Sequence, residues 1–468
     1  MTVAPTPATL RRLTEVVGEA HAIAEPAAQA AYVTEWRGLW SGRSALVLRP
    51  GNTAEVSRLL AIAHETGTAI VPQSGNTGLV AGQMPDATGH EVVLSLDRLT
   101  RISAVDAAGN TLLVEAGVTV KAVQQAASAA GRLFPLSLAS EGSARVGGVL
   151  STNAGGIHVL AYGTARELCL GLEVVLADGR VWNGLRALRK DNTGYDLKAL
   201  FLGAEGTLGV ITAAVLKLFP LPKSYETALI AVPHPQAAVD LLSKTQKALG
   251  NRLVAFELLP RLGLDFVIRH MGARDPLAEA SPWYVLCESA EAPGSLETLT
   301  AAAIEEGLAT DAALAQSEAQ RSGLWALREN LSESQKFEGG SIKHDVSVPI
   351  SRIPEFIAEA DAAVVRFLPG ARPFPFGHIG DGNIHYNVSQ PPGMDNKAFT
   401  DLWEPLNDLV FEIVLKHAGS ISAEHGIGRL KRHWMTRIKQ PVELDLMRGL
   451  KQLLDPAAIL NPHKVLPD

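Results

Sequence analysis

The sequence contains only two cysteines, Cys169 and Cys287, among its 468 residues. Two cysteines are too few for a disulfide framework, and both lie among apolar neighbours, so we expect buried free thiols. No uninterrupted apolar run approaches the ~18–20 residues of a membrane helix, so we expect no membrane span. Residues 1–7 lack the basic and apolar regions of a secretory signal. Together these absences predict a cytoplasmic protein.

An excess of basic residues is also missing. The 42 lysines and arginines are outnumbered by 49 aspartates and glutamates, which gives a formal net charge of −7 and a pI near 6.0. Because nucleic acids and anionic membranes attract basic surfaces, we expect neither as a partner. Hydrophobic residues make up 47% of the chain, which suffices for two or three domains with substantial cores.

Residues 1–40 are expected to form an N-terminal helical segment, because apolar residues recur there at helical spacing. Between residues 41 and 222, short apolar runs alternate with amphipathic stretches, which is typical of mixed helices and strands. Thr53 is the expected N-cap of the first helix in this region. Expected strands cover 45–48, 69–72, 92–96, 102–105 and 111–115, expected helices cover 53–65 and 120–130, and a hairpin is expected at 172–182.

Two prolines, Pro220 and Pro222, indicate a domain boundary. Beyond it, strand-like runs alternate with long helical stretches, which predicts helices packed over an antiparallel sheet. The runs are at 228–232 and 283–287, and the helical stretches are at 311–336 and 353–367. From residue 403 onward the pattern is mostly helical. The sequence therefore predicts an α+β protein in which residues 41–222, 223–402 and 403–468 follow the N-terminal segment.

The segment from Gly377 to Asn387 carries a strong chemical signal. Asp381-Gly382 is a favoured two-residue hairpin turn, and folding the chain about it places His378 opposite His385 with Cβ atoms roughly 5 Å apart. Further along the chain, Glu424-His425 lies in a glycine-rich turn. Two imidazoles and a carboxylate are typical of a catalytic zinc site with open coordination positions. The alternative is a pair of hydrogen-bonded structural histidines beside an ordinary loop.

Three glycine-rich loops lie within residues 41–222, at 72–78, 143–156 and 203–209. Glycine lets the backbone approach a ligand closely, and the exposed N–H groups of such loops can bind a pyrophosphate. The pattern Gly-x-Gly-x-x-Gly after a strand is missing, so a Rossmann nucleotide site is not indicated. Each loop alone is also typical of an ordinary turn, but three in one domain favour a nucleotide.

Several motifs resemble the FAD domain of the vanillyl-alcohol-oxidase type flavoproteins. These motifs are residues 72–78, 147–156, 162–163, 189–197 and 206–209. The histidine hairpin, Glu424-His425 and residues 459–462 resemble the D-2-hydroxyacid dehydrogenase branch of that family. The resemblance covers nearly the whole chain beyond residue 40. It implies a two-subdomain FAD-binding fold, an α+β substrate domain, and a helical C-terminal segment that completes the active site and the flavin site.

The resemblance implies that FAD is held noncovalently, because Asn76 stands where covalently flavinylated relatives have a histidine. Ser74 departs from the glycine that relatives often carry there, and it is small enough to be harmless. The residues implied to bind FAD are Pro72, Gln73, Ser74, Gly75, Asn76, Thr77, Gly78, Leu79, Ser143, Gly147, Gly148, Ser151, Thr152, Asn153, Gly155, Gly156, Tyr162, Gly163, Glu205, Gly206, Gly209, Ile211 and Asn461.

The resemblance also implies that His378, His385 and Glu424 bind zinc or a similar divalent ion. Such an ion lowers the pKa of the substrate hydroxyl, and His425 is then the general base that removes its proton. The α-hydrogen would leave as a hydride to flavin N5. Asn387 lies two residues after His385 on the same strand face, and it is expected to donate a hydrogen bond to the substrate carboxylate.

Substrate choice is implied to depend on Arg328, Ser332 and Lys343, which match residues that grip a second, distal carboxylate in the family. Arg328 and Ser332 are four residues apart on a predicted helix, hence on one face. Ser332 stands where relatives have threonine and keeps the hydroxyl. The resemblance therefore implies D-2-hydroxyglutarate as the preferred substrate. The alternative is that Arg328 and Lys343 pair with acidic neighbours on a solvated surface.

Other activities stay open on the sequence. The runner-up is a broad-specificity or D-lactate-preferring D-2-hydroxyacid dehydrogenase with the same chemistry. A 2-hydroxyacid oxidase and a noncatalytic flavin-binding subunit are further alternatives, although the complete set of metal ligands and base argues against the second. The resemblance implies a homodimer and an electron acceptor such as an electron-transfer flavoprotein, a quinone or a cytochrome.

Overall fold

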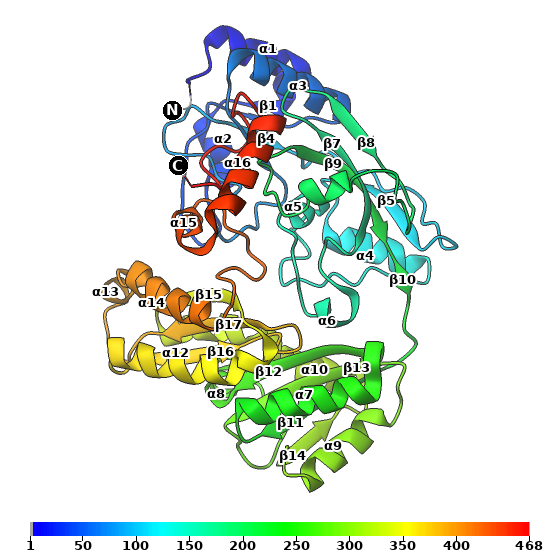
Figure 1. The fold of residues 1–468 in the computed structure, drawn as a ribbon, viewed down its shortest axis with the longest axis vertical. Coiled ribbons are helices and arrows are strands. Elements are labelled where there is room, and N and C mark those ends of the chain that lie inside the picture. Colours follow the sequence, from blue (N-terminus) through cyan, green and yellow to red (C-terminus); the bar gives the residue numbers. More distant parts are fainter. Residues whose placement is uncertain (1–2, 468) are drawn as a thin grey trace. The chain divides into compact units, whose positions relative to one another are not determined.

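The structure, a computed structural model, describes residues 3–467. The chain forms two compact units (Figure 1). Unit 1 comprises Met1–Gly155, Gly163–Leu221 and Glu424–Asp468, and unit 2 comprises Gly156–Tyr162 and Pro222–Ala423. Both units combine helices with sheets, so the expected α+β class is confirmed.

The first sheet of unit 1 has the strand order β1-β2-β4-β3. Strands β2 (Leu46–Leu48), β4 (Val92–Ser95) and β3 (Ile70–Gln73) run parallel, and β1 (Ala22–Ile23) adds antiparallel to β2. The apolar runs of β2 and β4 are buried throughout, as expected of parallel strands covered on both faces.

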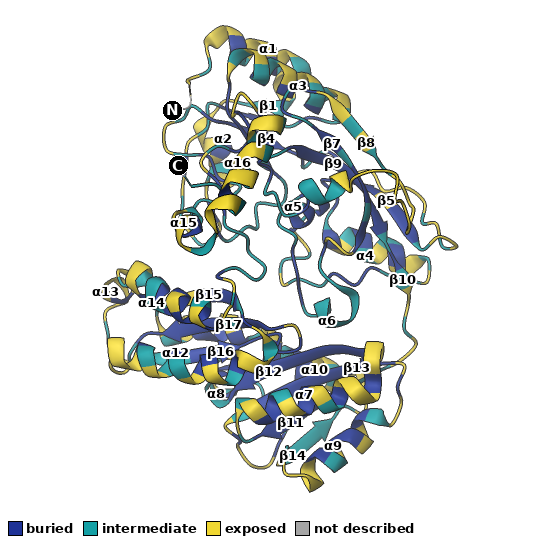
Figure 2. Cartoon of the chain, in the orientation of Figure 1, coloured by how far each residue is buried: buried dark blue, intermediate teal, exposed yellow. Residues whose placement is uncertain are grey.

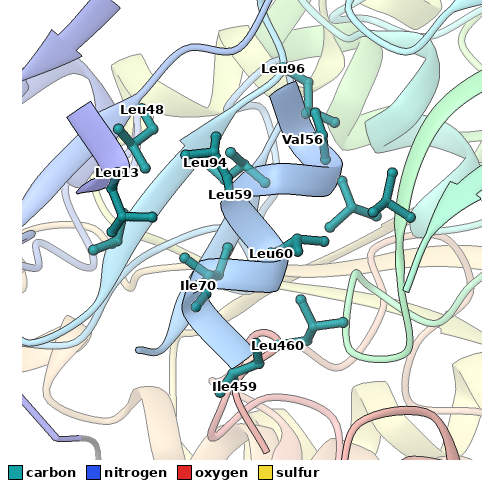
Figure 3. Close-up of a cluster of buried hydrophobic side chains, with 14 of the residues drawn as sticks. Leu13, Leu48, Val56, Leu59, Leu60, Ile70, Leu94, Leu96, Ile459 and Leu460 are labelled. Atoms are coloured by element: carbon teal, nitrogen blue, oxygen red, sulfur yellow. The ribbon is translucent and has the colours of Figure 1, made fainter. Parts of the chain in front are cut away.

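Helix α3 (Thr53–Thr66) packs on this sheet through Val56, Leu59 and Leu60, which belong to a single buried cluster (Figure 3). Its N-cap is Asn52 rather than the expected Thr53, because the Asn52 side chain accepts a hydrogen bond from the Glu55 backbone. Helix α1 (Pro7–Val17) covers the same cluster with Leu13.

Residues far along the sequence complete this core. Ile459 and Leu460 lie in the same cluster, as the lower part of Figure 3 shows. The Ile70 N–H donates to the Ile459 carbonyl at 2.8 Å, and the Asn461 N–H donates to the Ile70 carbonyl at 2.8 Å. The segment therefore extends the first sheet beside β3.

The second sheet of unit 1 is antiparallel, in the order β5-β9-β7-β8. Its strands are β5 (Thr111–Glu115), β9 (Val210–Lys217), β7 (Cys169–Val175) and β8 (Val181–Gly184). Helices α4 (Val120–Ala129) and α5 (Val146–Ser151) follow its first strand, and α15 (Met435–Ile438) and α16 (Pro441–Leu454) end the unit. A short pair joins β6 (Arg132–Leu133) to β10 (Phe219–Pro220).

Unit 2 contains an antiparallel sheet in the order β12-β13-β11-β14. Strands β12 (Leu253–Pro260), β13 (Trp283–Ala290) and β11 (Tyr225–Val232) are buried almost throughout, whereas α7 (Pro235–Leu249) and α9 (Ser295–Glu305) also carry exposed residues (Figure 2). Strand β14 (Asp311–Leu314) forms one edge of this sheet. Helices α8 (Arg261–Met271), α10 (Glu318–Glu329) and α11 (Leu331–Ser334) complete this part.

A smaller antiparallel sheet of unit 2 has the order β15-β17-β16. Its strands are β15 (Ser341–Ser347), β17 (Asn383–Ser389) and β16 (Arg372–Phe376). Helices α12 (Ile353–Phe367) and α14 (Trp403–Lys416) contact it, with α13 (Asn396–Thr400) between β17 and α14. The short helix α6 (Val159–Tyr162) contacts β12.

Several expected elements differ from the structure. Residues 8–40 form two helices, because Pro26 begins a separate helix α2 (Pro26–Val33) after the strand β1. The expected helix at 311–336 begins as β14, which pairs with β11. The expected strand at 102–105 contributes only an isolated bridge from Ile102 to Val114. Residues 403–423, expected in a separate C-terminal segment, belong to unit 2 because α14 packs on α12 and β15.

The buried cluster of unit 1 predicts a large cost for Leu59→Ala. Leu59 is fully buried, so truncation should lower the free energy of unfolding by about 2–5 kcal/mol. The matched control is Leu453→Ala in α16, where the side chain is 76% exposed, and it should change stability by less than about 0.5 kcal/mol. Denaturant titration followed by circular dichroism measures both, and equal losses would contradict this assignment of the core.

Candidate active site

His378 and His385 lie close together, although not in the register that the sequence predicts. In the hairpin, His385 of β17 pairs with Phe376, and β16 ends there. Gly377 leaves the hairpin and forms a two-way backbone bridge with Leu258 of β12, with N···O distances of 2.8 and 3.1 Å. The expected pairing of His378 with His385 is therefore wrong. The two imidazole centroids are nevertheless 5.4 Å apart.

Glu424 joins the two histidines. One possible ligand atom from each of His378, His385 and Glu424 lies within 4.8 Å of the others. Glu424 directly follows Ala423, whose N–H donates to the Asp345 carbonyl at 3.3 Å. Two imidazoles and one carboxylate match the donor set of a catalytic zinc site. The expected ligands therefore fit a divalent metal.

A second group of possible ligands shares Glu424. It consists of Asp345, Glu424 and His425, and their donor atoms also lie within 4.8 Å of one another. Asp345 is buried in β15 directly opposite His385, and its Oδ1 lies 3.9 Å from His385 Nδ1. Sequence reasoning missed Asp345 as a site residue. The signal was its place two residues after Lys343, hence on the same strand face.

Glu257 is the other acidic residue that sequence reasoning missed. Its Oε1 lies 2.7 Å from His378 Nδ1, and its Oε2 accepts a 2.7 Å hydrogen bond from Arg328 Nε. Burial by itself raises the pKa of Glu257, but the charges and hydrogen bonds of His378 and Arg328 outweigh it and hold this pKa at about 2. The only sequence signal was a single acidic residue within the apolar strand β12.

Arg328 is buried rather than paired with an acidic neighbour on its own helix. Only 8% of the residue is exposed, and its guanidinium carbon lies 4.9 Å from the centroid of Phe376. Ser332 lies beyond the end of α10 at Glu329 and is exposed in the next short helix, α11. Lys343 is also exposed, on the strand face that carries Asp345.

Asn387 lies on that same face, opposite Lys343 and Phe374. Its amide donates a 2.7 Å hydrogen bond to Gln335 Oε1, and Gln335 in turn donates to the Ser389 hydroxyl at 2.9 Å. One of the two amide hydrogens of Asn387 is therefore used within unit 2. No sequence pattern indicated Gln335 as a partner.

The glycine-rich loops of unit 1 approach one another more closely than side chains would allow. A Cβ added to Gly75 would lie 2.2 Å from the carbonyl oxygen of Ser143, and one added to Gly147 would lie 2.8 Å from Ala116 Cβ. Asn76 and Asn153 have left-handed backbone conformations, with φ of 53° each. Such closely packed, glycine-lined backbone is suited to a pyrophosphate, so these residues fit FAD.

Glu205 and Asn461, both expected at the flavin, connect loops of unit 1. Glu205 accepts hydrogen bonds from the Ile427 and Gly428 backbones at 2.7 and 2.8 Å. Burial raises the pKa of Glu205 to about 7, although these two hydrogen bonds lower it. Asn461 donates to the carbonyls of Gly82 and Glu205 at 2.9 and 2.7 Å. Glu205 thus fixes the backbone shortly after His425.

The remaining expected cofactor residues divide between the units. Gln73 donates to the Tyr32 carbonyl at 2.8 Å, and Asn76 donates to the Ala31 carbonyl at 2.8 Å, which ties the first loop to α2. Gly156 and Tyr162 belong to the short segment of unit 2 that contains α6.

Comparison with known proteins identifies the family to which this chain belongs. Residues 44–184 match the family described as FAD binding domain, and residues 221–465 match that of the C-terminal domain of FAD linked oxidases. The mitochondrial D-2-hydroxyglutarate dehydrogenase of Bos taurus is 40% identical over 440 residues, which cover 92% of this chain and 79% of that protein. The chain belongs to the FAD-linked D-2-hydroxyacid dehydrogenases. It is therefore an FAD-dependent oxidoreductase.

Two further comparisons describe the family and the fold. A putative mitochondrial D-lactate dehydrogenase of Schizosaccharomyces pombe is 35% identical over 454 residues, 94% of this chain and 85% of that protein. The structure of p-cresol methylhydroxylase superimposes with a TM-score of 0.75 at 15% identity, covering 98% of this chain and 96% of that one. The expected vanillyl-alcohol-oxidase type fold is thus confirmed.

Within residues 3–467, no helix has the length and hydropathy of a membrane span. The bovine and yeast relatives are named mitochondrial, so the expected cytoplasmic location stays a prediction.

The contact between Gly75 and Ser143 predicts that Gly75→Ala weakens FAD binding. The added methyl group has no room, and overpacking of about 1–3 kcal/mol would lower FAD affinity by about 5- to 150-fold. Gly142→Ala is the matched control, because a Cβ there meets nothing within 4 Å. Fluorescence titration of the apoprotein with FAD measures both affinities. Equal affinities for the two variants would contradict the role of the loop contact.

Proposed function

We propose that this protein is an FAD- and zinc-dependent dehydrogenase that oxidises D-2-hydroxyglutarate to 2-oxoglutarate. The observation that carries the proposal is the connection of two groups through Glu257. One group is the ligand set of His378, His385 and Glu424, and the other is the buried Arg328. A metal site beside a buried cation suits a substrate with a carboxylate at each end.

The chemistry divides between the cofactors and the side chains. When bound, FAD supplies a hydride acceptor at N5, and zinc supplies a Lewis acid that lowers the pKa of the substrate hydroxyl. His378, His385 and Glu424 would hold the metal. His425 takes the hydroxyl proton on its imidazole. The Asp345 carboxylate beside it stabilises the resulting imidazolium.

The distal carboxylate is assigned to Arg328 and Lys343. Glu257 bonds Nε of Arg328, so the two terminal nitrogens of its guanidinium are directed to the substrate in this proposal. Lys343 contributes a second cation from its exposed position on β15, and Ser332 contributes a hydroxyl. Asn387 contributes its second amide hydrogen to the C1 carboxylate.

The second candidate is a dehydrogenase of broad specificity or one that prefers D-lactate. It is favoured by the exposure of Ser332 and Lys343, which gives the distal carboxylate only one buried partner. The name of the yeast relative agrees with it. Noncovalent attachment of FAD, a homodimer, and transfer of electrons to an electron-transfer flavoprotein or a quinone are proposed on the family resemblance.

Metal removal tests the first part of the proposal. A strong chelator should abolish D-2-hydroxyglutarate oxidation while FAD stays bound, and added zinc should restore it. His378→Ala, His385→Ala and Glu424→Ala should each lose stoichiometric zinc, because each removes one of only three protein ligands. Zinc content by elemental analysis and FAD content by absorbance measure the two cofactors separately.

His425→Ala should keep zinc and lose mainly turnover, by a factor of about 10²–10⁴. The matched control is His417→Ala, which removes a buried histidine of unit 2 that bonds Glu359 at 3.0 Å outside the site. This control should retain both zinc and activity. Full activity in metal-free protein would refute the metal assignment.

Substrate selectivity tests the second part. Charge-assisted hydrogen bonds contribute about 1.5–3 kcal/mol each, so kcat/KM for D-2-hydroxyglutarate should exceed that for D-lactate by ~10²-fold or more. Arg328→Ala and Lys343→Ala should each shrink that ratio, chiefly by weakening the dicarboxylate. Arg321→Ala, on the same helix but paired with Glu288, is the matched control and should leave the ratio unchanged. Equal efficiency on both substrates would favour the second candidate.

A further inference from the structure

Glu257 connects two side chains that the proposed function assigns to different tasks. Its carboxylate is fully buried, and each oxygen has one strong partner at 2.7 Å, His378 on one side and Arg328 on the other. The three residues come from β12, the segment after β16, and α10, all within unit 2. A single rigid carboxylate therefore fixes the distance between the metal ligand and the arginine.

We propose that Glu257 is a positioning residue that couples metal binding at His378 to the placement of Arg328. Metal affinity then depends on the arginine even when substrate is absent. This inference rests on the proposed function, because it needs a metal at His378 and a role for Arg328 at the substrate.

The first half of the coupling concerns the imidazole. Glu257 faces Nδ1 of His378, so this nitrogen carries the hydrogen and Nε2 is the nitrogen presented to a metal. A carboxylate behind a metal-binding histidine fixes the ring orientation and makes the ligating nitrogen more basic. Loss of such a carboxylate typically costs 10–100-fold in metal affinity.

The second half concerns the guanidinium. Arg328 is held by Glu257 at Nε and lies 4.9 Å over the ring of Phe376. The same Phe376 ring lies 5.1 Å from the ring of His385, the second expected ligand. Arg328 is thus linked to both histidines, through Glu257 to His378 and through Phe376 to His385. A change in the position of Arg328 therefore alters the positions of both histidines through these contacts.

The molecule contains a matched pair without a histidine. Glu288 of the neighbouring strand β13 is also fully buried, and it binds Arg321 of the same helix α10 at 2.8 Å. Its other partners are the Thr227 hydroxyl and the Trp325 indole, at 2.6 and 2.7 Å. Glu288 is therefore a control for the purely structural role of a buried glutamate. Comparing the two glutamate–arginine pairs distinguishes an effect on stability from an effect on metal affinity.

The first experiment measures the zinc dissociation constant of the FAD-loaded protein by competition with a chromogenic chelator, without substrate. Glu257→Gln should raise this constant about 10–100-fold, because the neutral amide is a weaker acceptor for His378. Glu288→Gln should lower the melting temperature but leave the zinc constant within about threefold of the wild-type value. Equal zinc constants for wild type and Glu257→Gln would overturn the coupling.

The second experiment uses the arginine, so that the test survives if Glu257→Gln fails to fold. Arg328→Met should shift the zinc constant by about threefold or more in the absence of substrate, whereas Arg321→Met should not. In the Glu257→Gln background, Arg328→Met should have a smaller effect, because the connecting carboxylate charge is gone. An Arg328→Met protein with wild-type zinc affinity and altered KM alone would overturn the coupling.

The outcomes also separate this inference from the proposed function. Wild-type protein that binds no zinc would end the proposed function and the inference together. Wild-type protein that binds zinc, with affinity indifferent to Glu257 and Arg328, would end the inference alone.

Discussion

A carboxylate buried away from water must have partners, and this constraint organises both units of the protein. An ionised group without them costs several kcal/mol, whereas one with two strong hydrogen bonds becomes a fixed point in the fold. Glu257 meets the requirement with an imidazole and a guanidinium, Glu288 with an arginine, a hydroxyl and an indole, and Glu205 with two backbone amides. In each case the partners come from distant parts of the sequence.

Hydrogen bonds of the backbone flank Glu424 and His425 on both sides. Before them, the Ala423 N–H bonds the carbonyl of Asp345 in unit 2. After them, the Ile427 and Gly428 N–H groups bond the Glu205 side chain in unit 1. The backbone N–H groups on both sides of the dipeptide are thus held by hydrogen bonds. Gly426 between them has φ of 79°, a conformation that favours glycine.

Local patterns predicted that His378 and His385 lie close together, but not which distant residues contact them. His378 and His385 are seven residues apart, so any tight return of the chain brings them together, and the structure does so with a different register. The register was wrong because Gly377 pairs with Leu258, a residue 119 positions earlier that no turn rule includes. Glu257 was missed for the same reason, since both of its partners are remote in sequence.

Secondary structure was predictable where it follows from a local sequence pattern. The prediction failed where pairing with a distant strand determines the conformation. The parallel strands β2, β3 and β4 and the helix α3 follow directly from apolar runs and amphipathic spacing. Residues 311–314 have no strand pattern of their own, and they become β14 only because the edge of β11 accepts them. Ser332 was expected on one helix with Arg328, yet α10 ends at Glu329 and Ser332 lies in the separate short helix α11.

The addition of residues 459–461 beside β3 has a consequence for the order of folding. Unit 2 is almost continuous in sequence, so its two sheets can form as soon as residue 423 has been synthesised. The parallel sheet of unit 1 is completed only when residues 459–461, more than 380 positions beyond Ile70, pair with β3. Ile459 and Leu460 also complete the buried cluster of that unit. Contacts of such long sequence separation form slowly. A ribosome-bound chain therefore exposes the edge of β3 throughout the synthesis of unit 2, and aggregation at that edge is the characteristic risk of this topology.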